Sequence, residues 1–157
     1  MAAAKIEHRI GVKASAETVW ELVSNLDTWE SWNPLYPKAA GALRIGAPLD
    51  LILALPGKPS RVIQPIVVDW VPLEQLHWQQ SGMGGLVRSI RYIEIEALQE
   101  DGCVVSNGEI FTGLLGPRVA RSLRKPIRQG FTAMGEALRD RAEAAWRDRA
   151  GTPTSAS

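Results

Sequence analysis

Hydrophobic positions follow two different periods along the chain, and the change between them divides it in two. Up to about residue 113 most apolar residues alternate with polar ones, which is typical of half-buried strands. After Gly116-Pro117 the spacing becomes three or four residues, which is typical of an amphipathic helix. Strands followed by one long helix predict an α+β domain with the helix laid across one sheet face.

The chain is predicted to begin with a strand and two short helical segments. Residues 5–12 alternate as a strand would. Ser15 is expected to cap a helix ending near Asn25, because its side-chain oxygen can accept hydrogen bonds from free amides of the first turn. Asp27 is expected to cap a second short turn, which Pro34 stops because proline has no amide donor.

Six further strands are predicted between residues 40 and 113. Short connections rich in glycine and proline separate them, which favours an antiparallel meander in a sheet of about seven strands. Pro65 falls inside one of these patterns and indicates an edge or a bulge there. The predicted strands cover residues 43–45, 49–55, 61–71, 75–80, 87–97 and 103–112.

A long C-terminal helix is predicted from one apolar stripe. Pro126 and Gly130 interrupt the pattern, so we expect a kink or a break near Lys125. We expect a single domain over residues 1–150 and a disordered tail at 151–157. The stripe comprises Val119, Leu123, Ile127, Phe131, Met134, Leu138, Ala142 and Ala145.

Length and composition exclude several classes of protein. The 157 residues hold 18 basic and 17 acidic side chains and one cysteine, so no disulfide forms within the chain. No stretch approaches the roughly 20 apolar residues of a membrane span, and the first ten residues lack the apolar stretch of a signal peptide. These features predict a cytoplasmic protein, a monomer or homodimer, without stable membrane insertion. A net charge of +1 gives no overall attraction to nucleic acid.

The residues that usually hold metals or attack substrates are scarce. His8 and His77 are the two histidines and have no cysteine pair beside them, so we predict no metal site and no cofactor. The glycines at 82–85 lack the Lys-Ser/Thr of a phosphate loop and indicate a hairpin turn. Cys103 has no basic neighbour in sequence that would lower its pKa.

Six of the ten aromatic residues are tryptophans, and they offer the first indication of a binding site. Large flat side chains with one N–H donor each can line an apolar pocket, although many tryptophans serve only as core. Trp32 lies in an irregular turn, while Trp70 and Trp78 continue apolar strand faces. These three are the predicted pocket residues.

Glu109 is the acidic residue of greatest interest. It shares a strand face with Cys103, Val105 and Phe111, where an unpaired carboxylate would have its pKa raised. One interpretation is a structural ion pair with Arg88 or Arg91, or a contact with the turn at 32–33. The other is a carboxyl group that orients a ligand or acts as acid and base. Asn33 fits either one, as a local cap of that turn or as a residue at a cavity mouth.

A basic run opens the C-terminal helix. It contains no acidic residue and lies on the polar side of the stripe. A solvated helix face is one interpretation, and contact with phosphate on a lipid head group or nucleic acid is the other. No recognisable nucleic-acid module accompanies the run, so we predict no nucleic-acid partner. The run comprises Arg118, Arg121, Arg124, Lys125 and Arg128.

Taken in order, several short motifs resemble one known superfamily over residues 5 to about 146. The chain is similar to START-like (SRPBCC) proteins of the polyketide cyclase/dehydrase and lipid-transport type. The motifs are Val19-Trp20, Trp32-Asn33-Pro34, Gly41-x-x-x-x-Gly46, Pro65, Pro72-x-x-x-Leu76-x-Trp78, Glu109-x-Phe111-x-Gly113, and a final helix with Phe131 and Leu138.

The resemblance implies a helix-grip fold, in which a curved antiparallel sheet wraps around the C-terminal helix and encloses a cavity. It implies Trp32, Asn33, Glu109 and Phe111 as cavity residues, and Phe131, Met134 and Leu138 as the helix face that closes the cavity. Aromatising cyclases of this superfamily would be expected to carry a histidine or a Tyr/Arg set, and no such set is visible along the sequence.

Three functions follow as hypotheses. The first is a carrier of a hydrophobic or amphipathic small molecule, lipid-like or polyketide-like, held between sheet and helix. The second is a cyclase or dehydratase with Glu109 as its acid/base. The third is a protein-interaction module that uses the basic helix face.

Overall fold

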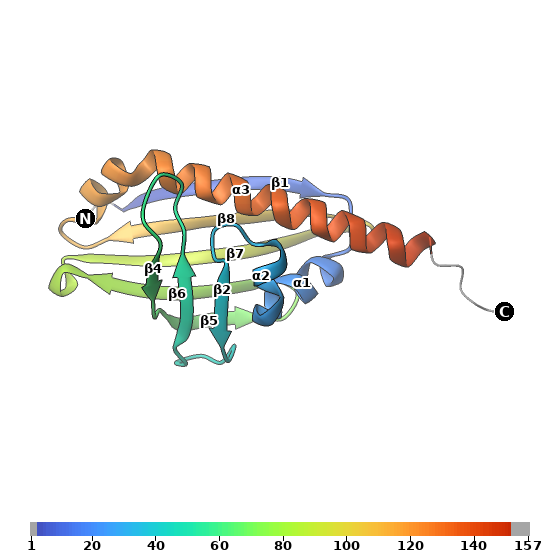
Figure 1. Cartoon of the computed structure of the whole chain (residues 1–157), viewed down its shortest axis with the longest axis horizontal. Coiled ribbons are helices and arrows are strands. Elements are labelled where there is room, and N and C mark those ends of the chain that lie inside the picture. The colour runs from blue at the N-terminus through green and yellow to red at the C-terminus, as the bar shows by residue number, and fades with distance from the viewer. Residues whose placement is uncertain (1–2, 152–157) are drawn as a thin grey trace.

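The computed structural model describes residues 3–151 and places most strands in one antiparallel sheet. The sheet has the order β1-β8-β7-β6-β5, so the last four strands form the predicted meander and β1 closes the edge beside β8 (Figure 1). The strands are β1 (Ala4–Val12), β5 (Ile66–Val71), β6 (Gln75–Gly82), β7 (Val87–Gln99) and β8 (Gly102–Thr112).

A second, three-stranded sheet has the order β2-β3-β4 and consists of β2 (Lys38–Gly41), β3 (Leu49–Leu53) and β4 (Arg61–Ile63). The single predicted strand over 61–71 is therefore two strands, which part beside Pro65 as its missing amide donor requires. The predicted strand over 43–45 is wrong. Those residues lead into a turn in which Gly46 has a φ of +89°, and the paired residues are those of β2 instead.

Two short helices follow β1, as predicted, and a 3-10 turn lies between them. These elements are α1 (Ala16–Ser24), η1 (Leu26–Thr28) and α2 (Trp29–Trp32). The predicted cap by Asp27 is wrong, because Asp27 lies inside that 3-10 turn. Ser15 caps α1, since its Oγ accepts a hydrogen bond from the Thr18 amide at 3.1 Å. A further 3-10 turn, η2 (Met83–Gly85), joins β6 to β7 at the glycine-rich hairpin.

The C-terminal helix α3 (Gly116–Gly151) is continuous and packs mainly against β1 and β8. It runs through Pro126, so of the predicted kink or break near Lys125 the break does not occur, and the kink stays a prediction. Burial of the stripe on both sides of the proline, including Ile127 and Phe131, explains this, because tertiary packing outweighs the loss of one helical hydrogen bond. Of the predicted tail, Gly151 ends α3, and residues 152–157 lie outside the described residues.

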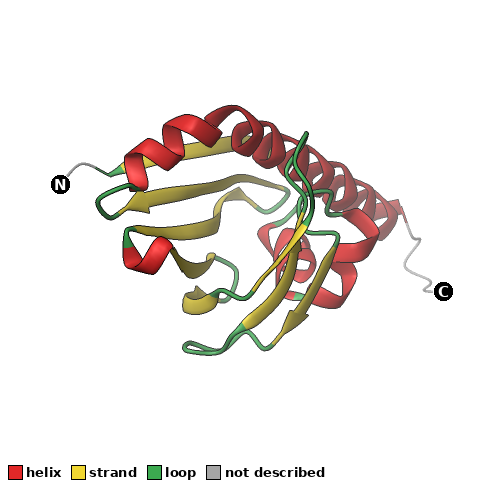
Figure 2. Ribbon diagram, turned by 60° about the vertical axis from the view of Figure 1, so that its left-hand side comes forward, coloured by secondary structure: helices red, strands yellow, loops and turns green. Residues whose placement is uncertain are grey.

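The core lies between the curved five-stranded sheet and α3, with the three-stranded sheet and the short helices on the open side (Figure 2). This is the predicted α+β helix-grip arrangement. Both sheets border the interior of this arrangement. The side chains that point into the interior determine which part of it is filled.

Candidate active site

Along the sheet, the inward faces change from apolar to polar. On β7 alternate residues point inward. Ser89 and Arg91 come first along the strand, and the apolar residues Ile93 and Ile95 come after them. On the antiparallel strands β8 and β6 the change has the same direction in space, since Asn107 and Glu109 follow Val105, and Gln80 follows Leu76 and Trp78. The strand register aligns these changes, because Arg91 lies opposite both Glu109 and Trp78. One end of the interior is therefore apolar and the other polar.

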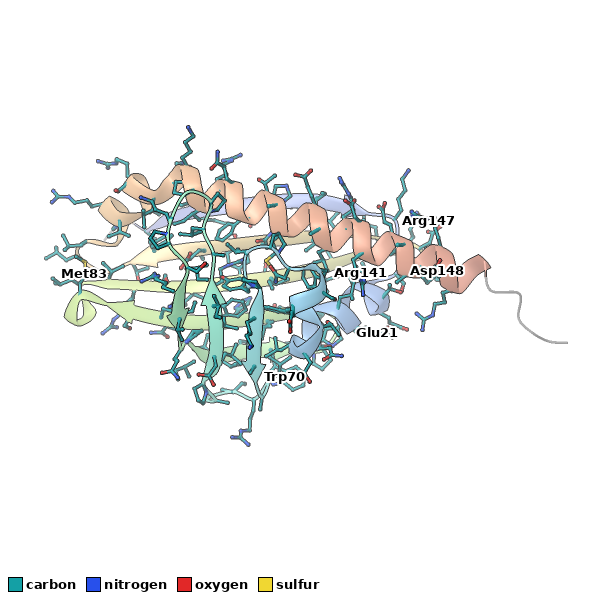
Figure 3. The ribbon with its side chains drawn as sticks, viewed as in Figure 1. Glu21, Trp70, Met83, Arg141, Arg147 and Asp148 are labelled. Atoms are coloured by element: carbon teal, nitrogen blue, oxygen red, sulfur yellow. The ribbon has the colours of Figure 1, made fainter. Side chains whose placement is uncertain are left out.

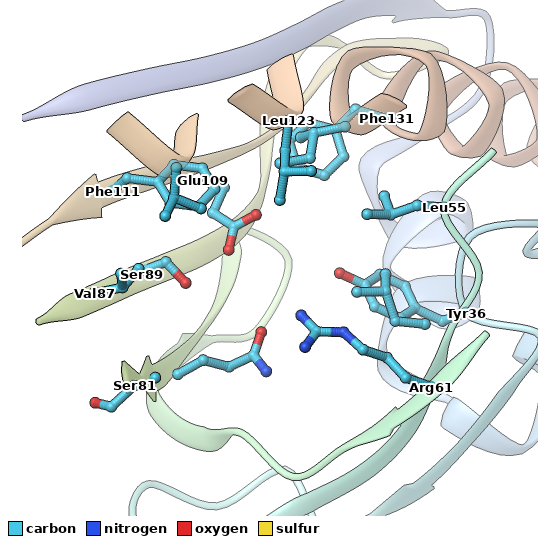
Figure 4. A pocket seen from close by; sticks show the side chains of 15 residues that line it. Tyr36, Leu55, Arg61, Ser81, Val87, Ser89, Glu109, Phe111, Leu123 and Phe131 are labelled. Carbon is cyan, nitrogen blue, oxygen red and sulfur yellow. The ribbon is translucent and has the colours of Figure 1, made fainter. Parts of the chain in front are cut away.

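A pocket of about 160 Å³ lies at the polar end (Figure 4). Both sheets, the loop after α2 and the first half of α3 contribute to its wall. Its polar lining residues are Tyr36, Arg61, Gln80, Ser81, Ser89 and Glu109. The others are Leu53, Leu55, Gly82, Val87, Phe111, Val119, Leu123, Ile127 and Phe131. All four α3 residues in the lining are apolar, so polar groups face an oily wall across the pocket.

Glu109 provides the one carboxyl group in this lining, and its surroundings raise its pKa. Burial is the largest cause, because removal of water disfavours the charged form. A hydrogen bond with Ser89 and the positive charges of Arg91 and Arg61 act in the opposite direction without cancelling the effect of burial. A carboxyl group in this setting keeps its proton to a higher pH than an exposed glutamate does.

Arg91 is a buried cation directly behind the pocket. Its guanidinium donates to the carbonyls of Tyr92 and Gly108, and to Asn107 Oδ1 at 2.8 Å. The Phe131 ring lies 4.0 Å from the guanidinium carbon, which is a cation–π distance. Within residues 3–151 Arg91 forms no ion pair, so neutral dipoles and an aromatic face stabilise its charge.

Arg91 also orients Tyr36. Its Nε donates to the Tyr36 hydroxyl oxygen at 3.0 Å, so that oxygen is the acceptor and its own proton is left for another group. Burial raises the pKa of Tyr36, although the Arg91 charge opposes this. Tyr36 is therefore a neutral hydrogen-bond donor, and its hydroxyl points toward the same space as the Glu109 carboxyl (Figure 4).

Three of the predicted site residues line this pocket: Glu109, Phe111 and Phe131. Met134 and Leu138 lie farther along α3 and are buried in the core. Met134 contacts the site indirectly, because its sulfur accepts a hydrogen bond from Arg91 Nη2 at 3.3 Å.

The predicted tryptophans lie outside the pocket lining. Trp78 and Trp32 pack around Trp29 in the apolar end of the interior, with centroids 6.2 and 6.1 Å from its ring. Trp70 stacks on Trp20 at the sheet edge farthest from α3 (Figure 3). Tryptophan therefore fills the interior here, and does not border its free space.

Asn33 has the local role that was one of its two interpretations. Its Oδ1 accepts hydrogen bonds from the amides of Leu35 and Tyr36, both at 3.0 Å. This cap fixes the turn after α2 and so positions Tyr36. Asn33 is fully enclosed and does not line the pocket.

Six polar residues of the site were not among the predicted site residues: Tyr36, Arg61, Ser81, Gln80, Ser89 and Arg91. For the last three a signal existed, since the period-two alternation that places Glu109 inside does the same for them. Tyr36 and Arg61 lie in a turn and at the start of a three-residue strand, where no periodicity operates. The absence of a Tyr/Arg set inferred from the sequence is corrected, because the fold brings Tyr36, Arg61 and Arg91 together.

Between residues 3 and 151, no group of three or more His, Cys, Asp or Glu side chains is placed to hold a metal ion. No helix in the same part of the chain is long and apolar enough to cross a membrane. The cytoplasmic location and the oligomeric state stay predictions.

Solved structures with this fold include enzymes. The Zhui aromatase/cyclase from Streptomyces sp. R1128 is 19% identical, with a TM-score of 0.73 over 96% of this chain and 99% of that chain. A point mutant of norcoclaurine synthase from Thalictrum flavum is 18% identical, with a TM-score of 0.67 over 92% and 96%. A Staphylococcus aureus protein of unknown function is 16% identical, with a TM-score of 0.64 over 91% and 96%.

Among curated proteins none matches the sequence significantly. The family described as polyketide cyclase/dehydrase and lipid transport matches residues 3–143, nearly the whole of the described chain. With the helix-grip fold and the enclosed pocket beside α3, that match identifies this chain as a member of the polyketide cyclase/dehydrase and lipid transport family.

Proposed function

We propose that this protein is a cyclase- or dehydratase-type enzyme that acts on a small carbonyl compound, with Glu109 as its general acid and base. The observation that carries the proposal is the placement of Glu109, the one carboxyl group in the lining, in a pocket whose burial raises its pKa. Proton transfer is most efficient when the pKa of the catalytic group lies near the working pH. An exposed glutamate is more acidic than this, and burial moves the pKa of Glu109 in the required direction.

The pocket residues divide the chemistry between them. Ionised Glu109 removes a proton from the carbon beside a carbonyl, and protonated Glu109 returns a proton to a departing hydroxyl. Tyr36, whose oxygen already accepts from Arg91 Nε, donates a hydrogen bond to the carbonyl oxygen as negative charge develops there. The apolar α3 wall excludes water from the reacting atoms.

The size of the pocket limits the substrate. A cavity of about 150 Å³ accommodates benzene in another protein, so 160 Å³ suits a single ring or a short branched chain. A longer polyketide-like molecule would have to extend beyond the pocket. The family match and the aromatase/cyclase and synthase names of similar structures support this class of chemistry.

The second candidate is a binding protein for the same kind of small molecule. The observation that favours it is the lining itself, where nine of the fifteen residues are apolar or glycine and can hold a ring without any reaction. The two candidates share the pocket and differ in what Glu109 does there.

Exchange of α-protons separates the two candidates without knowledge of the natural substrate. In D2O, the protein should accelerate deuterium incorporation into cyclohexanone, followed by NMR. Glu109→Gln should reduce the acceleration by about 10²- to 10⁴-fold, the usual contribution of a general base, and leave binding unchanged. Glu96→Gln, an exposed glutamate outside the pocket, is the matched control.

Saturable binding of the ketone without accelerated exchange would favour the binding protein. A Glu109→Gln variant that no longer folds would instead assign Glu109 a structural role.

A further inference from the structure

Arg61 is a cation of the pocket wall for which the fold provides no bonded partner. It begins β4, is exposed, and extends its guanidinium toward the space that Glu109 faces from β8 (Figure 4). Within residues 3–151 the Arg61 side chain makes no hydrogen bond and no ion pair, although its charge acts on Glu109 over a longer distance. Arginine offers five donors in a planar fork, which suits a carboxylate.

The charges around the pocket do not balance. Two cations act on it, Arg61 in the wall and Arg91 behind it, against the single carboxyl of Glu109. The pocket is therefore positive by one charge when Glu109 is ionised and by two when it is protonated. Positive potential in a concave, partly dry site concentrates anions.

We infer that the pocket takes a ring-sized organic anion, with a carboxylate of the ligand bound by the Arg61 guanidinium and its ring against the apolar α3 wall. This inference rests on the same pocket as the proposed function and names the charge class of the molecule bound there. It concerns binding, and so it holds or fails independently of turnover.

Proton uptake follows from the geometry. The charged or titratable groups that face Glu109 are Arg91 from β7, Arg61 from β4 and Tyr36 from the loop after α2, while α3 presents apolar side chains there. An anion that occupies Arg61 removes part of the positive potential that favours ionised Glu109 and adds a negative charge nearby. Binding therefore favours protonated Glu109, and affinity should rise as the pH falls through the pKa of Glu109.

Calorimetric titration with benzoate and its neutral analogue benzamide tests the inference. We expect benzoate to bind at least tenfold more tightly and, in buffers of different ionisation heat, to take up a fraction of a proton. Arg61→Gln should weaken benzoate binding by about 10- to 100-fold, the usual value of a hydrogen bond between charged groups, and leave benzamide binding unchanged. Arg61→Lys should recover part of the loss.

The matched control is Arg88→Gln, which removes an exposed arginine on the outward side of β7 next to the pocket residues Val87 and Ser89. It should not alter benzoate affinity beyond a small salt-sensitive change. Equal affinity for benzoate and benzamide, no binding of either at millimolar concentration, or equal effects of the Arg61 and Arg88 variants would each overturn the inference. Benzoate selectivity without ketone exchange would leave it standing and remove the catalytic proposal.

Discussion

Both ends of the interior lie between the five-stranded sheet and α3, but side chains fill one end and the other contains the pocket. At the filled end, Trp29 and Trp78 lie against each other, and Tyr36 reaches Trp78 with a centroid distance of 5.6 Å. At the hollow end, the same sheet and the same helix enclose the pocket beside Glu109. Both regions share the five-stranded sheet and α3, and they differ in the side chains that point inward from the surrounding elements.

The difference teaches where a cavity can persist. Apolar side chains gain by close packing, so a region lined by them alone contracts until it is full. A carboxyl and a guanidinium resist this, because dehydration of either group costs more than the packing returns. Arg91 marks the boundary, since it satisfies its donors against backbone carbonyls and packs between Phe131 and Trp78.

The sharpest test of this comparison removes a large apolar side chain from each end. Trp78 is fully buried, so Trp78→Ala should lower the free energy of unfolding by about 3 to 5 kcal/mol through loss of burial and the new void. Leu123 is half-buried beside space that already exists, so Leu123→Ala should cost only about 1 kcal/mol. Urea denaturation of both variants measures the contrast. Similar losses would mean that the two ends are equally packed.

A smaller effect is expected at the seam between helix and sheet. Gly135 of α3 lies over His8 of β1, and a Cβ at position 135 would lie 2.5 Å from His8 Nδ1. Gly135→Ala should therefore destabilise the protein by about 1 to 2 kcal/mol, although alanine otherwise favours a helix. In a His8→Ala background the same change should become stabilising by about 0.5 to 1 kcal/mol. Thermal or urea denaturation of the four proteins completes the cycle, and additive effects would show that the two residues do not collide.

The sequence predicted the fold well where periodicity operates. The layers of the fold were predicted from strand alternation over β1, β7 and β8 and from the apolar stripe of α3. The start of α1 was predicted from Ser15. The strand predicted at residues 43–45 is wrong, and the break expected near Lys125 does not occur, because tertiary packing outweighs the local preference there. Pro65 indicated an irregularity in the predicted strand. The second sheet that results depends on the pairing of β4 with β3.

The site was predictable in part for the same reason. Glu109 was found because strand alternation placed a carboxyl among apolar residues, and Ser89 and Arg91 carried the same signal. Arg61 and Tyr36 reach the pocket through a short strand and a capped turn, whose positions only the folded chain determines. A tryptophan can line a cavity or fill the core, and the size of its side chain does not distinguish these two roles.

The smallest expected effect concerns the hollow end alone and is a pH dependence. The raised pKa of Glu109 means that the folded protein retains this proton to a higher pH than the unfolded chain does. Its contribution to stability is fully present below the unfolded value near 4.5 and is lost as the pH rises through the folded value. Glu109→Gln stays neutral throughout, so its stability relative to the natural protein should increase between pH 4 and pH 8.

Urea midpoints across that range measure the change. The sign of the slope is the informative quantity. If the Glu109→Gln variant instead lost relative stability as the pH rose, ionised Glu109 would be a net partner of Arg61 and Arg91. The hollow end would then be held by an ion pair across the pocket, and the acid/base role would lose its physical basis, because a carboxyl stabilised in its charged form is a weak proton donor.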